Sequence, residues 1–64
     1  MKQIIIDNLR QTGRLLIDNK PQGKTRPATV FEHDMVLWIT FSRQLYRVTD
    51  RVSQTRYNVE LFEV

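Results

Sequence analysis

Side chains branched at Cβ dominate this chain, and residues with strong helix propensity are scarce. The 64 residues include five Ile, six Val and six Thr, but a single alanine, Ala28, and only three Glu and three Lys. Branching at Cβ restricts χ1, which disfavours a helix interior and suits the pleated surface of a sheet. Residues 1–64 are also too few to divide into two compact domains. The sequence therefore predicts one all-β domain, a small antiparallel barrel or twisted sheet of about five short strands.

A short internal echo marks two of these strands. Ile4–Asn8 is an apolar run closed by Asp-Asn, and Leu15–Asn19 repeats that pattern eleven residues later. Asp and Asn side chains bond to nearby backbone groups and initiate turns. Each copy therefore predicts a strand that ends in a turn.

The next segment, residues 19–27, carries the strongest local charge. Pro21 and Pro27 bracket it, Gly23 lies between them, and it holds no acidic residue. Proline fixes its own φ and restricts the residue before it, and glycine adds conformational freedom. We expect residues 19–27 to form a basic mobile loop.

The second half of the chain predicts a hairpin followed by two further strands. Ala28–Glu32 and Met35–Phe41 are its arms, joined by a polar tip at 32–34. Leu45–Val52 and Arg56–Val64 alternate apolar and polar residues, as half-buried strands do. Trp38 is expected in the core, because so small a domain needs its largest side chain there.

Residues 34–52 also support a rival interpretation. Their apolar residues include a stripe at helical spacing, formed by Trp38, Phe41, Leu45, Val48 and Val52. That stripe predicts an α+β fold with one amphipathic helix. Six β-branched residues would lie in this helix with no alanine to offset their low propensity, so we favour strands.

The net charge of +3 is unevenly distributed. Residues 1–31 have six Lys or Arg and two acidic residues, whereas residues 32–64 have four Arg and five acidic residues. Clustered cations indicate an acidic partner, of which nucleic acid, DNA or RNA, is the commonest. The residues expected to contact phosphates are Lys20, Lys24, Arg26, Arg43, Arg47, Arg51 and Arg56. Tyr46 and Tyr57 are candidates for stacking on bases, although packing in the core is the favoured interpretation of both.

The residue inventory argues against catalysis. The chain has one histidine, two serines, no cysteine and no phosphate-binding glycine loop. The cluster Glu32-His33-Asp34 has adjacent side chains that diverge, so it does not predict a metal site. We therefore expect a non-enzymatic nucleic-acid-binding module, such as a small regulator. We expect it to use no cofactor and no small-molecule substrate.

The C-terminal residues suggest a second function. Leu61, Phe62 and Val64 place apolar side chains on both faces of the last strand, which is typical of a protein-protein interface or a homo-oligomer. No apolar run approaches the roughly 20 residues that a membrane span needs. The lack of cysteine fits a reducing compartment. We therefore expect a cytoplasmic protein that does not associate with membranes.

Overall fold

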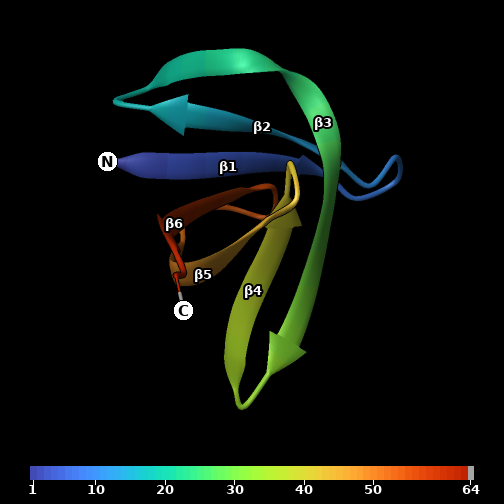
Figure 1. Cartoon of the computed structure of the whole chain (residues 1–64), viewed down its shortest axis with the longest axis vertical. Coiled ribbons are helices and arrows are strands. Elements are labelled where there is room, and N and C mark those ends of the chain that lie inside the picture. Colours follow the sequence, from blue (N-terminus) through green and yellow to red (C-terminus); the bar gives the residue numbers. More distant parts are fainter. Residues whose placement is uncertain (64) are drawn as a thin grey trace.

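Six antiparallel strands close into a barrel in the computed structural model, which describes residues 1–63 (Figure 1). The strands are β1 (Lys2–Asp7), β2 (Thr12–Ile17), β3 (Lys20–His33), β4 (Val36–Phe41), β5 (Gln44–Arg51) and β6 (Arg56–Leu61). Each strand pairs with the next along the chain, and β1 pairs with β6 to close the sheet. The predicted small all-β barrel is confirmed, with one strand more than expected. The alternative helix over 34–52 is wrong, because β4 and β5 occupy this segment.

The long strand β3 makes closure of the barrel possible. Its first half pairs with β2, from Lys20 opposite Ile17 to Pro27 opposite Thr12. Its second half pairs with β4, from Ala28 opposite Phe41 to His33 opposite Val36. Figure 1 shows β3 running above β2 and then bending downward to lie beside β4. One strand thus belongs to both sides of the barrel.

The loop expected at residues 19–27 is therefore wrong, since most of this segment is the first half of β3. Among the described residues this half pairs with β2 only, so its other edge is open. Proline lacks an N–H donor and is tolerated at such an edge. Gly23, at φ 75°, lies where the register between β2 and β3 shifts. A bulge and an open edge accommodate the residues that suggested a loop.

Three of the hairpins turn through two residues that both have positive φ. These turns are Asp18–Asn19, Asp34–Met35 and Ser42–Arg43, with φ between 49° and 71°. Turns of this kind match the twist of the strands and favour Asn, Asp and Gly. The hairpin predicted between residues 28 and 41 is confirmed, but Met35 lies in its turn rather than in a strand.

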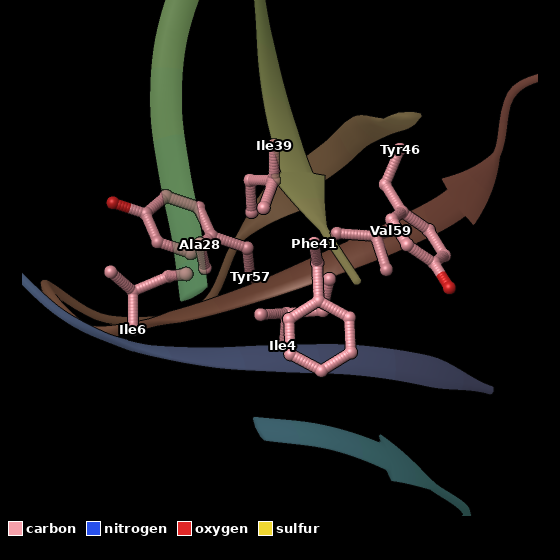
Figure 2. Close-up of a cluster of buried hydrophobic side chains, with 8 residues drawn as sticks. All are labelled: Ile4, Ile6, Ala28, Ile39, Phe41, Tyr46, Tyr57 and Val59. Atoms are coloured by element: carbon pink, nitrogen blue, oxygen red, sulfur yellow. The ribbon is translucent and has the colours of Figure 1, made fainter. Parts of the chain in front are cut away.

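Alternate side chains of the strands fill the barrel interior. The core contains Ile4, Ile6, Ala28, Ile39, Phe41, Tyr46, Tyr57 and Val59, which point toward one another in Figure 2. Gly13 on β2 lies against this core, where its missing side chain leaves room for Ala28 and Ile6. A larger residue at position 13 would require these neighbours to shift.

Trp38 is not part of this core, contrary to expectation. Successive residues of a strand point to opposite faces, so a β4 that directs Ile39 inward must direct Trp38 outward. The Trp38 side chain is half-buried on the outside of the barrel, and its Nε1 donates a hydrogen bond to the His33 carbonyl at 3.2 Å. Residues 1–63 include no helix that is long and apolar enough to cross a membrane.

Candidate functional site

Most of the cationic side chains have no acidic partner. Of the ten Lys and Arg residues, only Arg47 forms a salt bridge within residues 1–63. Its Nε and Nη2 donate hydrogen bonds of 2.8 and 2.6 Å to Oε1 of Glu60, which lies directly opposite on β6. The charge of Arg47 is thus balanced locally, whereas the nine other cations form no salt bridge with any residue in 1–63.

Arg51 and Arg56 are engaged with neutral groups of the protein. Arg51 donates to the carbonyls of Ser53 and Gln54 at 3.1 and 3.4 Å and lies over the Tyr57 ring, 5.4 Å from its centroid. Half-buried Arg56 donates from Nη1 to Gln3 and Asn19, both at 3.4 Å. These contacts brace the turn after β5 and join β6 to the turn between β2 and β3.

The arginines predicted from the second half of the chain do not form one surface. Arg47 and Arg51 line a shallow hollow between β4 and β5, which Asp50 also lines. Arg56 lines a separate hollow with Met1, Asp18 and Asn19. Arg47 and Arg51 therefore share one hollow, and Arg56 lines another.

Neither tyrosine is placed to stack on a base. Tyr46 and Tyr57 have 4% and 3% of their surface exposed, and both belong to the core. The Tyr46 hydroxyl donates a hydrogen bond to Oε1 of Gln44 at 3.1 Å, and burial raises the pKa of Tyr46. The core interpretation of both residues is confirmed, and the stacking role is wrong because their rings lie inside the barrel.

A second group of cations lies along β2 and the first half of β3. Lys20, Lys24 and Arg26 are exposed on the open half of β3. Arg14 of β2 is exposed beside them, with its Nη2 3.3 Å from Oγ1 of Thr25. Arg14 and Thr25 also line a hollow with Arg10 from the turn before β2. We call Arg10, Arg14, Lys20, Lys24 and Arg26 the basic ribbon.

The two carboxylates nearest the basic ribbon in sequence are occupied by other groups. Oδ1 of Asp7 accepts hydrogen bonds from the backbone N–H groups of Leu9 and Arg10, at 3.1 and 3.2 Å. Oδ1 of Asp18 lies 2.8 Å from the amino-terminal nitrogen, and this ammonium lowers the pKa of Asp18. Asp7 lines the same hollow as Arg10 and Arg14, but none of the five cations forms a salt bridge within residues 1–63.

Sequence reasoning missed Arg10 and Arg14. The echo between Ile4–Asn8 and Leu15–Asn19 placed a strand immediately after Arg14, and the basic segment followed that strand. Had residues 19–27 been predicted as a strand, hairpin pairing would have put Arg14 beside that segment. The missing information was the pairing of β2 with β3.

Arg26 and Arg43 line the same hollow although they are 17 positions apart in the chain. They line one hollow of about 440 Å³ with Pro27 and Ser42. Arg26 comes from the basic ribbon and Arg43 from the turn between β4 and β5. This hollow extends the ribbon across the bend of β3.

The structure describes two of the three residues that were expected to form an apolar interface. Leu61 is half-buried against the core, and Phe62 has 44% of its surface exposed. Phe62 meets Trp38 edge to face, with ring centroids 5.1 Å apart. Phe31, 40% exposed, lies opposite Trp38 on β3. Val64, the third predicted residue, lies outside the described residues.

The tip at Glu32-His33-Asp34 is a polar hairpin end. Nε2 of His33 lies 3.4 Å from Oδ2 of Asp34, and both side chains are largely exposed. In the part of the chain that the structure describes, no three His, Cys, Asp or Glu side chains converge as metal ligands would. Comparison with known proteins finds no match to any protein-family model, curated protein or solved structure.

Proposed function

We propose that this protein is a non-enzymatic nucleic-acid-binding module that contacts phosphates through the basic ribbon. The observation that carries the proposal is that five cations on β2, β3 and the preceding turn are exposed, and that none of them has a salt-bridge partner within residues 1–63. Such a set creates a positive field that attracts a polyanion. Without cysteine the module suits the reducing cytoplasm, where it would act as a small regulator.

The ribbon is better suited to phosphates than the arginines of β5 and β6. Arg47, Arg51 and Arg56 would each have to exchange an existing hydrogen bond for a phosphate contact. By contrast, Lys20, Lys24 and Arg26 donate no side-chain hydrogen bond to another described residue. Each ribbon cation that meets a phosphate releases a condensed counterion, which makes binding favourable at low salt.

The same cations have a purely structural explanation that must be separated from the proposal. Lysine and proline on an open strand edge prevent another strand from pairing with it. Lys20, Pro21, Lys24 and Pro27 all lie on the open half of β3. If protection of the edge is their whole role, the protein will not bind nucleic acid, and neutralising the lysines will cause self-association instead.

The first test is fluorescence anisotropy of labelled single- and double-stranded DNA and RNA, titrated at roughly 50 and 200 mM salt. If about four phosphates on duplex DNA are neutralised, affinity falls on the order of 100-fold between these salts. Binding with this salt dependence supports the proposal and identifies the preferred strand type. Absence of binding to all four probes at the lower salt would overturn it.

A pair of triple variants then locates the site. The ribbon variant carries Arg14→Gln, Lys20→Gln and Lys24→Gln, and the control carries Arg47→Gln, Arg51→Gln and Arg56→Gln. Both variants lose three charges, so a nonspecific charge effect would lower their affinities for nucleic acid equally. We expect the ribbon variant to lose most of the affinity and about three units of the logarithmic salt slope, at about 0.9 per phosphate contact. A larger loss in the control would place the site on β5 and β6. Thermal melting verifies that both variants are folded.

The outward aromatic residues favour a second candidate function, self-association. Phe31, Trp38 and Phe62 lie on the outside of β3, β4 and the end of β6, beside the Arg47–Glu60 pair. A small domain gains stability when a second copy covers such residues. Sedimentation of wild type and Phe62→Asp tests this function. A wild-type protein that sediments with the mass of a monomer at high concentration excludes it.

A further inference from the structure

The hollow between Arg26 and Arg43 forms where two paired strands separate. The register of β3 with β4 pairs Ala28 with Phe41, so the residues before Ala28 face those after Phe41. There β3 continues alongside β2, while Ser42 and Arg43 turn the chain into β5. Divergence of the two segments opens the hollow of about 440 Å³. The position of the hollow is therefore set by the bend of β3, which is part of the sheet.

The residues around this hollow offer donors for an anion. Arg26, Pro27, Ser42 and Arg43 line it, and no acidic residue does so. Neither Arg26 nor Arg43 makes a side-chain hydrogen bond or a salt bridge to another residue in 1–63. A guanidinium presents its N–H groups in a planar fork that matches two oxygens of a phosphate. Two such forks at one hollow can together hold one phosphoryl group.

The backbone of Arg43 provides an independent observation. Arg43 has φ 65° at the second position of its turn, a conformation that favours glycine and is disfavoured for arginine. The side chain makes no polar contact with the described residues that would account for an arginine there. Backbone strain of this kind is concentrated at functional sites. Met35 has a similar φ of 64° in the preceding hairpin but carries no charge, so a positive φ does not by itself indicate an anion site.

We propose that Arg26 and Arg43 form a phosphate-binding site, which takes one phosphoryl group between their guanidinium groups. The inference rests on the proposed function, because it names the position at which a phosphate of the nucleic acid is held. The basic ribbon attracts the polyanion over a distance, and this site fixes one phosphate relative to the barrel. The ammonium group of a lysine acts as a single point charge, whereas the two guanidinium groups at this site can also orient the phosphate oxygens.

The test uses NMR spectra of the ¹⁵N-labelled full chain, titrated with three probes. Inorganic phosphate supplies the free anion, a dinucleotide supplies one phosphodiester, and the same dinucleotide with a 5′-phosphate adds a phosphomonoester. We expect saturable shifts of the Arg26, Ala28, Ser42 and Arg43 amides. Saturation by the plain dinucleotide assigns the site to backbone phosphates, and saturation only by the other two probes assigns it to terminal or free phosphate. Absence of saturable shifts with all three probes overturns the proposal.

Arg43→Gly is the decisive variant. Glycine is favoured at this turn position, so the variant should fold at least as well as wild type while losing one of the two donor groups. Met35→Gly is the matched control, because it makes the same backbone change in a turn away from the hollow. We expect Arg43→Gly to abolish the phosphate-induced shifts and Met35→Gly to keep them. Equal shifts in both variants would contradict the assignment. Arg26→Gln, which leaves the turn intact, must also weaken binding.

Failure of this inference can be distinguished from failure of the proposed function. In the anisotropy assay, Arg43→Gly should lower the logarithmic salt slope by about 0.9, which is one phosphate contact. If Arg43→Gly binds nucleic acid like wild type while the ribbon variant does not, the phosphate site is wrong and the module remains a nucleic-acid binder. If phosphate shifts occur but no nucleic acid binds, the proposed function is wrong and the anion site remains.

Discussion

Trp38 on β4 and Phe62 at the end of β6 meet edge to face on the outside of the barrel. Their ring centroids are 5.1 Å apart and their planes cross at 89°. β5 lies between the two strands in the sheet, so the contact spans its outer face. Edge-to-face contacts of this kind contribute about 0.5–1.5 kcal/mol beyond the area they bury. The aromatic pair thus holds Phe62 and the end of β6 against β4 and β5.

We expect Phe62→Ala to move the fluorescence of Trp38 toward longer wavelength, because the substitution opens the ring of Trp38 to water. Trp38 is the only tryptophan, so emission reports on this contact alone. Stability should fall by about 0.5–1.5 kcal/mol in urea denaturation. Leu9→Ala is the control, since Leu9 is 98% exposed in a turn and should change neither quantity. An unchanged emission spectrum in Phe62→Ala would contradict the contact.

Gly13→Ala should destabilise the barrel through overpacking. A Cβ at this position would lie 3.0 Å from Cβ of Ala28 and 3.0 Å from Cδ1 of Ile6. Forcing a methyl group into a packed core costs typically about 1–3 kcal/mol. Adding Ala28→Gly removes the nearest clashing methyl group and should restore part of the loss. Urea denaturation of both single variants and the double variant measures this coupling. If the stability changes of the two single variants add up to that of the double variant, the two residues do not compete for space.

Met35→Gly should stabilise the protein. Met35 is 93% exposed and has φ 64°, a conformation that disfavours residues with a Cβ by about 1–2 kcal/mol. The greater freedom of glycine in the unfolded chain offsets about 0.5–1 kcal/mol of that gain. We expect a net increase of about 0.5–1 kcal/mol, which raises Tm by a few degrees in a domain this small. Met35→Leu keeps the Cβ and should leave Tm unchanged, so a rise in that variant would point to another cause.

Asp18→Asn should reduce the loss of stability in acid. The amino-terminal ammonium, which donates a hydrogen bond to Asp18 and attracts its charge, lowers the pKa of this carboxyl group. A lowered pKa in the folded state means that the pair stabilises the fold above the unfolded pKa of about 3.9. This contribution is lost as pH falls through the lower, folded value.

Melting temperatures measured across this acid range provide the test. Asparagine tolerates the φ of 49° at this position, so the turn itself should persist. Acetylation of the amino terminus removes the other partner and should flatten the pH dependence in the same way. If wild type and Asp18→Asn lose stability in parallel, Asp18 does not contribute to the acid response.

Local properties of the residues were sufficient to predict the fold class. Abundant Ile, Val and Thr and the near absence of alanine predicted strands, because their χ1 preferences act within each residue. Two pairs, Asp7–Asn8 and Asp18–Asn19, marked turns for a similarly local reason. The burial of Tyr57 and Val59 followed from alternation along one strand. None of these inferences requires information about which strands pair with each other.

What only the tertiary structure decided depends on pairing between strands. β3 exists as one strand because β2 and β4 pair with different halves of it, so Pro21 and Gly23 could not reveal it. The register of β5 with β6 puts Glu60 opposite Arg47 and balances that charge. The bend of β3 brings Arg26 to Arg43. Backbone hydrogen bonds between distant segments set these neighbours, and a sequence pattern read within one segment contains no information about them.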